Sequence, residues 1–482
     1  MVDELHATKQ SAEALLSVDY WRRICPGLHI DDSKFQASRL ERRGPEVVDR
    51  ASCTDVRQRL LDEGFAALPA PSLRWSIDVA SLADAAQCLE RHGWPPTFLA
   101  MYDEAWAMAL DASEIMKEAT GNSLSMDIVG FLVDPANTKG FSPHRDRQPE
   151  DWVPRGMPPQ VSSTFKADGM AKYVTLWAAL TDANPDNSCL HFVPKACDPG
   201  YSKGDTEDGD PMQLCFPIKD GYQNIRCAPV AQGGCTFHTH RTIHWGSSGR
   251  PGYRGRPRIA LSFGFSTPDF EPPYFNPKSL PFPALGLRLA LCSAQVLNYS
   301  TLSIGDVKGW IALAGGMAGC PTSMLNFLHK LFQRQSKAFH PTYRKLIAGK
   351  FVEVSLYRQK TAPKLAAASM DSTEGGDQGA KDLEHGAEGS TPDKSAGPKR
   401  EPAPIAEAES DEDDDALEAM LSAEKEHGEV LFHDDFDMLN SGDGGEGWPV
   451  PGGGKRKKRK GDLAADGPAK RPRGKKEKRP RA

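Results

Sequence analysis

Three side chains in the middle of this 482-residue chain, His144, Asp146 and His244, have the types and the setting of metal ligands. His144 and Asp146 are two residues apart in a stretch with the pattern of a β-strand, so both side chains should lie on one face. His244 follows a Gly-Gly turn and a short strand pattern, and it precedes a strand that carries arginine. We expect the three side chains to converge on a single ion.

The donor set leaves two kinds of chemistry open. Two imidazoles and one carboxylate occupy one face of an ion and leave the opposite positions free, which is typical of non-haem Fe(II) oxygenases. The same set would also fit a hydrolytic zinc site. Arg258 favours the first, because a permanently charged guanidinium that points inward needs an anion, and a carboxylate is its best bidentate partner. A keto-diacid such as 2-oxoglutarate can meet the metal at one end and Arg258 at the other.

Other residues compete for these roles. The His-x-Asp triplets at 29–31 and 433–435 lack a rigid strand to aim them. His238 and His240 share the strand before His244 and are alternative ligands. A surface ion pair for His144 with Asp146, and a surface position for Arg258, are the plain structural alternatives.

The order of the elements indicates how these side chains are positioned. Helices are predicted at about 55–63, with Gly64 just after the last turn, at 76–92 and at 97–118. Strand patterns follow from residue 123: 124–133, a strand that carries His144 and Asp146, then 173–180, 189–193, 225–230, 235–239 and 258–265. Helical composition returns at 285–350. We therefore predict a mainly β fold with flanking helices, a double-sheet jelly roll at about 123–270.

Several segments together resemble the phytanoyl-CoA dioxygenase family of iron(II)- and 2-oxoglutarate-dependent oxygenases, over roughly residues 60–270. The matching features are ordered along the chain: His144-Arg-Asp146, the strand from Val174 to Asp182, Asn187-Ser-Cys-Leu-His-Phe-Val-Pro194, Gly233 eleven residues before His244, and Arg256-Pro-Arg258.

The resemblance implies a double-stranded β-helix, cupin-like core, with His144, Asp146 and His244 as metal ligands and Arg258 as the cosubstrate residue. Trp177 matches a position near the cosubstrate. The implied cofactors are Fe(II), 2-oxoglutarate and O2, with ascorbate as an additional reductant, and the implied reaction is substrate hydroxylation with release of succinate. Gly246 stands where the family commonly has serine, and the interval from His244 to the arginine strand is longer than is typical. Arg256 is therefore an alternative to Arg258.

Composition divides the chain into three parts. Residues 1–17 form a polar leader, 18–361 the oxygenase-like domain, and 362–482 a tail too poor in aromatic residues to form a core, which we expect to be disordered. The tail contains an acidic segment with interleaved apolar residues at 407–438, which either binds a protein partner or serves as a solubilising linker. Two basic clusters at 455–476 match a bipartite signal for the nuclear import machinery.

The remaining composition indicates a soluble intracellular protein. The ten cysteines are scattered without a CxxC pair, and the net charge of -6 is small and unevenly distributed. We expect a nuclear protein, otherwise cytoplasmic, without a membrane span. The substrate class stays open between a small molecule, a lipid, a nucleotide and a peptide. The competing functions are a catalytically silent jelly-roll scaffold that acts in the nucleus through its tail, and a zinc hydrolase.

Overall fold

The computed structural model describes residues 14–41, 47–134, 141–148, 161–205, 211–246, 249–299, 322–352 and 355. All of them belong to a compact unit that spans residues 1–379. Most of the predicted leader, the tail from residue 362, its acidic segment and its basic clusters lie outside the described residues. The boundaries given to those parts therefore stay predictions.

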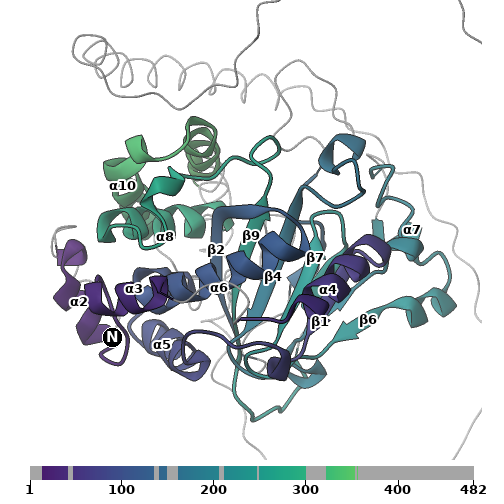
Figure 1. Ribbon diagram of the computed structural model, residues 1–482, viewed down its shortest axis with the longest axis horizontal. Coiled ribbons are helices and arrows are strands. Elements are labelled where there is room, and N and C mark those ends of the chain that lie inside the picture. The colour runs from purple at the N-terminus through teal and green to yellow at the C-terminus, as the bar shows by residue number, and fades with distance from the viewer. Residues whose placement is uncertain are drawn as a thin grey trace, which may run out of the picture. The chain divides into compact units, whose positions relative to one another are not determined.

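Two antiparallel sheets form the β core (Figure 1). The larger sheet has five strands in the order β1-β7-β4-β9-β2, and the smaller has four in the order β3-β8-β5-β6. The strands are β1 Phe65–Leu68, β2 Ser123–Val133, β3 Phe141–His144, β4 Tyr173–Ala179, β5 Leu190–Phe192, β6 Arg226–Ala228, β7 Cys235–Thr239, β8 His244–Gly246 and β9 Arg258–Ser266.

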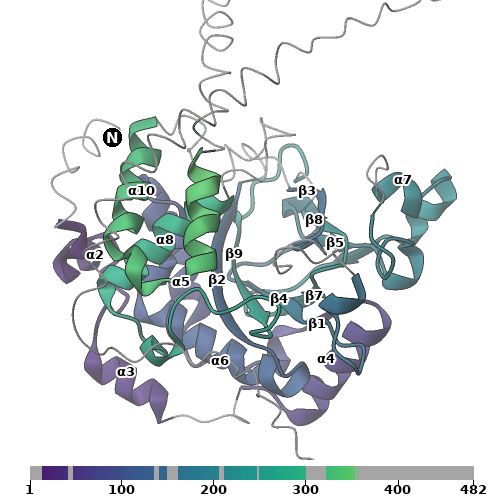
Figure 2. The same ribbon diagram turned by 90° about the horizontal axis from the view of Figure 1, so that it is seen from above.

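Helices cover the outer face of the larger sheet. Helices α5 (Val79–Arg91) and α6 (Asp103–Ala119) contact β2 and β9, while α4 (Arg50–Asp62) contacts β1 and β7. Figure 2 shows α5, α6, α8 and α10 on one side of this sheet and β3, β5 and β8 on the other. The remaining helices are α2 Val18–Ile24, α3 Ser33–Leu40, α7 Pro211–Cys215, α8 Leu285–Tyr299, α10 Thr322–Gln335 and a helix over residues 341–352.

Along each strand of the larger sheet, successive side chains point in turn into the apolar core under the helices and into the space between the two sheets. On β9, Ile259, Leu261, Phe263 and Phe265 are fully buried in the core beneath the helices. Burial of each such side chain stabilises the folded state by about 1.5–3 kcal/mol relative to leaving it exposed. The intervening side chains of the same strand face the smaller sheet, because successive side chains point to opposite faces. The helices thus hold the larger sheet through one face and leave the other free for chemistry.

The predicted fold class is confirmed, since the sheets are antiparallel and the helices flank them. Helix α4 ends at Asp62 and Gly64 follows in the left-handed conformation with φ +83°, as the sequence predicts. Over the described residues, no helix is long and apolar enough to cross a membrane.

The helix predicted at 97–118 is wrong in one respect. The structure has a 3-10 helix at Pro96–Met101, then α6 from Asp103, with Tyr102 extended between them. Tyr102 is buried and donates its hydroxyl hydrogen bond to the carbonyl of Trp21, 2.9 Å away. A partner distant in sequence therefore fixes the break, which local periodicity does not reveal.

Gly130 in β2 allows the chain to approach this 3-10 helix closely. A Cβ at Gly130 would lie 2.3 Å from the carbonyl oxygen of Pro96. Only glycine fits a strand position that touches another backbone in this way. The contact joins the edge strand of the larger sheet to the helical layer.

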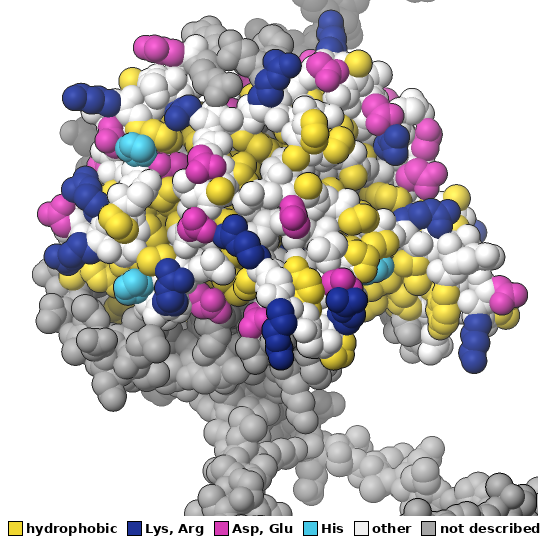
Figure 3. Space-filling view, turned by 90° about the horizontal axis from the view of Figure 1, so that it is seen from below, with side chains coloured by type: hydrophobic (Ala, Val, Ile, Leu, Met, Phe, Trp, Pro, Cys, Tyr) yellow, Lys and Arg dark blue, Asp and Glu magenta, His cyan; other side chains and the backbone are white. Residues whose placement is uncertain are grey.

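The surface in Figure 3 carries both signs of charge. Lysine and arginine side chains alternate there with aspartate and glutamate, with apolar side chains between them. Among the described residues of this face there is no continuous basic patch of the kind that tracks a nucleic-acid backbone.

A buried ion pair links α6 to α8 and provides a test of the fold. Arg288 Nη1 lies 2.7 Å from Asp103 Oδ1, and both side chains are almost completely buried. Asp103→Ala should lower the free energy of unfolding by about 3–5 kcal/mol, because it leaves an uncompensated buried charge. Asp84→Ala is the matched control: its partner Arg256 also lies at 2.7 Å, but both are exposed, so about 1 kcal/mol or less is expected. Chemical denaturation measures both, and equal losses would contradict this account.

Candidate metal and cosubstrate site

Pairing of β3 with β8 brings two histidines together. His144 ends β3, His244 opens β8, and the two residues are direct partners in the register. Their ring centroids are 4.4 Å apart. Asp146 lies just beyond the end of β3, so the expectation that one strand carries both His144 and Asp146 is wrong. The chain bends after His144, yet the carboxylate still faces both rings.

The three ligand atoms are close enough to share an ion. Asp146 Oδ1 lies 3.4 Å from His244 Nε2 and 3.8 Å from His144 Nε2. One ligand atom from each of the three residues lies within 4.8 Å of the others. The structure thus brings together the residues that the sequence predicts as ligands.

Backbone carbonyls fix the orientation of both imidazole rings. His144 Nδ1 is 2.8 Å from the carbonyl oxygen of Ser142, and His244 Nδ1 is 3.0 Å from that of Thr242. A carbonyl can only accept, so each Nδ1 carries the proton and each Nε2 keeps its lone pair. This is the usual arrangement of a metal-binding histidine, whose other ring nitrogen donates to a carbonyl or carboxylate.

Two neighbours hold the second oxygen of Asp146. Thr175 Oγ1 donates to Oδ2 at 2.5 Å, and His238 Nε2 lies 3.0 Å from the same oxygen. Oδ1 is left facing His144 and His244. The carboxylate is therefore oriented to offer one oxygen to an ion, and His238 acts on Asp146 through the other.

Electrostatics place these groups in the protonation states that ligands need. Burial alone would raise the pKa of Asp146, but His244 and His238 hold it well below its usual range. Burial, reinforced by His238, lowers the pKa of His244 well below its usual range against the opposing effect of Asp146. At neutral pH the carboxylate is thus ionised and His244 is neutral, so neither has to lose a proton to bind a metal ion.

Arg258 is a buried cation without a carboxylate partner. Four arginines of the described residues are buried, namely Arg145, Arg241, Arg258 and Arg288. Three of them form ion pairs with aspartates. Arg258 instead donates from Nη1 to the carbonyl of Ser188 at 2.7 Å, and its Nε has no hydrogen-bond partner among the described residues. Burial lowers its pKa to about 10, so it stays charged at neutral pH and an incoming anion would complete it.

One cavity connects the ligand set with this arginine. It has an empty volume of about 610 Å³, part of it open to solvent, and its lining includes His144, Asp146, His244, Trp177 and Arg258. The Arg258 guanidinium lies over the Trp177 ring, 5.4 Å from its centroid.

The glycine at position 246 makes room for the guanidinium. A Cβ there would lie 2.9 Å from Arg258 Nη1 and 3.1 Å from Ser188 Oγ. A serine at this position, as is common in the family that the sequence resembles, would force Arg258 to shift. The departure at Gly246 and the placement of Arg258 are therefore linked.

Two of the alternative residues, Arg256 and His240, lie elsewhere. Arg256 is half exposed and pairs with Asp84 at 2.7 Å, away from the cavity lining. Both ring nitrogens of His240 face other partners, the carbonyl of Tyr173 at 3.2 Å and Thr164 Oγ1 at 2.8 Å. The geometry thus favours Arg258 over Arg256 and leaves His240 outside the ligand set.

Sequence reasoning missed the polar network beside the ligands. Asp127 accepts hydrogen bonds from Arg147 and Tyr173, both at 2.8 Å, and from Tyr299 at 2.7 Å. Thr175 was also missed, although it could have been found, because it alternates with Tyr173 and Trp177 on one face of β4 and all three line the cavity. Tyr299 ends α8, far along the chain, and no local pattern indicates its position.

A family model matches the middle part of the chain. Residues 50–250 match the family model described as Phytanoyl-CoA dioxygenase (PhyH). No curated protein matches the chain.

Solved structures with similarity to this chain have low identity. The epimerase SnoN in complex with Fe3+, alpha ketoglutarate and nogalamycin RO is 19% identical, with 45% of this chain and 84% of that chain covered and a TM-score of 0.31. AviO1 from Streptomyces viridochromogenes Tue57 is 17% identical, with 46% and 96% covered and a TM-score of 0.31. EvdO2 from Micromonospora carbonacea var. aurantiaca complexed with 2-oxoglutarate is 17% identical, with 44% and 90% covered and a TM-score of 0.28.

The family model therefore confirms the resemblance drawn from the sequence motifs. Its range includes His144, Asp146 and His244 and ends before β9, the strand that carries Arg258. Residues 50–250 of this chain are therefore similar to the family described as Phytanoyl-CoA dioxygenase (PhyH).

Proposed function

We propose that His144, Asp146 and His244 hold Fe(II), and that the chain hydroxylates a substrate with conversion of 2-oxoglutarate to succinate. The observation that carries this proposal is the pairing of two imidazoles, each with Nε2 free, with the unshared oxygen of Asp146. Nitrogen and oxygen donors on one side of an ion suit Fe(II) and leave positions open. Bound iron would supply the activation of dioxygen for the oxidation of both substrates.

Arg258 is proposed to bind the far carboxylate of 2-oxoglutarate. Its side chain is buried, lines the cavity with the ligand set, and has no carboxylate partner among the described residues. A guanidinium with unused donors matches a carboxylate in both charge and geometry. Trp177 packs against the guanidinium and would limit its movement. The role of Arg258 is thus to orient the cosubstrate and to compensate its charge.

The cavity favours a small substrate with a largely apolar surface. Phe131, Phe141, Leu190 and Trp245 line it together with the polar groups described above. Such side chains exclude water and leave orientation to a few polar contacts. From the sequence, the loop at residues 147–171 is expected to border the mouth of the site, and its residues 149–160 lie outside the described part of the chain.

The competing functions have less in their favour. A silent scaffold has no need to keep two oriented imidazoles, an ionised carboxylate and an unpaired buried arginine in one cavity. A zinc hydrolase would use the three ligands but gives Arg258 no anion. A role for ascorbate as an additional reductant stays a prediction. The nuclear address, the import machinery and a partner for the acidic segment also stay predictions, since the tail segments that carry them lie outside the described residues.

Removal of one ligand tests the metal assignment. Full-length protein with Fe(II), ascorbate and 2-oxoglutarate should release succinate, measured by mass spectrometry. Asp146→Ala and His144→Ala should reduce the rate by more than about 100-fold, because even outer-shell partners of ligands contribute 10–100-fold. His92→Ala, an exposed histidine at the end of α5, is the control and should keep the wild-type rate. Wild-type protein that neither binds nor converts 2-oxoglutarate would refute the proposal.

The two arginines of the Arg-Pro-Arg segment allow a matched comparison for the cosubstrate. Arg258→Gln should weaken 2-oxoglutarate binding roughly 10- to 150-fold, since a hydrogen bond to a charged group contributes about 1.5–3 kcal/mol. Arg256→Gln should have no effect, because Arg256 pairs with Asp84 at the surface. Anaerobic calorimetry with Fe(II) present measures both affinities. The opposite ranking would move the cosubstrate to Arg256.

Thr175 tests the orientation of Asp146. Thr175→Val removes the hydroxyl that donates to Oδ2 but keeps the side-chain shape, so Fe(II) affinity should fall about 10- to 100-fold. Thr54→Val, on the exposed face of α4, is the control and should leave affinity unchanged. Competition with a chromophoric chelator gives both values. Unchanged affinity in Thr175→Val would show that Asp146 does not depend on this hydrogen bond.

A further inference from the structure

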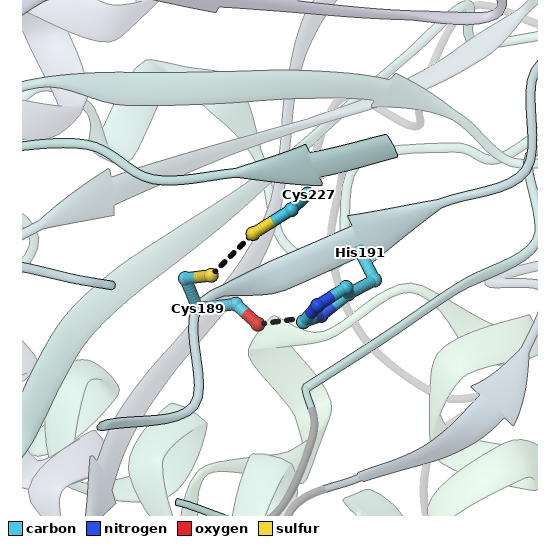
Figure 4. A group of neighbouring side chains, drawn as sticks. All are labelled: Cys189, His191 and Cys227. Carbon is cyan, nitrogen blue, oxygen red and sulfur yellow. Dashed lines mark hydrogen bonds between the residues drawn. The ribbon is translucent and has the colours of Figure 1, made fainter. Parts of the chain in front are cut away.

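A second group of metal-type side chains lies on the smaller sheet. Cys189 directly precedes β5, His191 lies within β5, and Cys227 is the β6 residue paired with His191. The two sulfur atoms are 3.2 Å apart, and one ligand atom from each of the three residues lies within 4.8 Å of the others. Figure 4 shows the sulfur atoms facing each other and the His191 ring against the Cys189 carbonyl. The two cysteines are 38 positions apart in the sequence, which hides this cluster from spacing rules.

The His191 ring is held like the rings of His144 and His244. Its Nδ1 lies 3.2 Å from the carbonyl oxygen of Cys189, two residues earlier, as the other two rings face carbonyls two residues earlier. The carbonyl can only accept, so Nδ1 carries the proton and Nε2 keeps a lone pair. The Trp245 ring stacks on the His191 ring, with 5.5 Å between the ring centroids, and further limits the rotation of the imidazole.

We propose that Cys189, His191 and Cys227 form a second metal site, for a thiophilic cation of the Zn2+ type, with one position left for water or an external ligand. Two sulfur donors and one imidazole are a recognised zinc donor set and are unsuited to Mg2+ or Ca2+. The first site offers only nitrogen and oxygen. Donor type therefore separates the two sites chemically.

Exposure allows a cation to enter. Cys189 is fully buried, His191 is half-buried and Cys227 is exposed, so the site is open on the Cys227 side and anchored on the Cys189 side. A cysteine binds a metal ion as its thiolate, so binding releases a thiol proton and affinity should fall as the pH is lowered.

The site is connected to the cosubstrate arginine through one peptide unit. Ser188, which precedes Cys189, accepts the 2.7 Å hydrogen bond from Arg258 Nη1. A cation that fixes Cys189 against β6 would also fix this carbonyl. The second site is thus placed to support the position of Arg258, although its existence does not depend on the proposed function.

Thiolate-to-metal charge transfer tests the proposal. Full-length protein, kept reduced with a phosphine, is titrated with Cd2+ and followed in the near ultraviolet. Wild-type protein should show a thiolate band that saturates at one equivalent. Asp146→Ala should keep this band, because the first site contains no sulfur, so the two proposals fail or succeed separately.

Cysteine variants identify the ligands. Cys227→Ser, at an exposed position, should lose the band and weaken Zn2+ binding more than about 100-fold, because loss of a ligand exceeds the 10–100-fold cost of an outer-shell partner. Cys197→Ser, a half-buried cysteine outside the cluster, is the matched control and should bind as wild type. His191→Ala should also weaken Zn2+ binding, measured by chelator competition.

Three results would overturn the proposal. They are a wild-type protein without a thiolate band, a band that survives Cys227→Ser, and a reduced protein that binds no Zn2+ but whose oxidised form contains a Cys189–Cys227 disulfide by peptide mapping. The last result would identify the pair as a redox couple instead of a metal site.

Discussion

The pairing of β3 with β8 is the constraint on which the rest of the site depends. It sets His144 opposite His244 across two neighbouring strands. Each ring is then fixed by a carbonyl of its own strand segment, and Asp146 is brought in by the bend that follows β3. A register shift of one residue would turn every side chain of β8 to the other face and separate the imidazoles. The donor set is therefore a property of strand register more than of any single contact.

The larger sheet supplies the second half of the site from its inner face. Thr175 and Trp177 on β4 and Arg258 on β9 all point between the sheets, while their neighbours along the strands are buried beneath the helices. Helix packing on one face thus fixes polar groups on the other. This division lets an apolar core of ordinary composition support a cavity that holds several charged groups.

Charge compensation distinguishes Arg258 from the other buried arginines of the described residues. Arg145, Arg241 and Arg288 are buried with aspartate partners and tie loops and helices together. Arg258 is equally buried, but it donates a hydrogen bond to a backbone carbonyl instead of forming an ion pair. A buried cation without an anion is costly, and structures keep such a group where a ligand completes it. The same carbonyl segment leads into the Cys189 cluster, so the two proposed sites share β5 as a support.

The sequence alone determined the mainly β class, the flanking helices and the α4 boundary at Gly64, because periodicity and ordered motifs are local features of the chain. It also predicted that His144, Asp146, His244 and Arg258 belong to one site, and all four line the same cavity. Tertiary structure decided the break at Tyr102, the bend that removes Asp146 from β3, the choice of Arg258 over Arg256 in the cavity, and the meeting of Cys189 with Cys227. Each of these depends on a partner far away in the chain, such as Trp21 for Tyr102 or Asp84 for Arg256. Local sequence patterns contain no information on which distant groups meet, since that is fixed only when the sheets and helices pack.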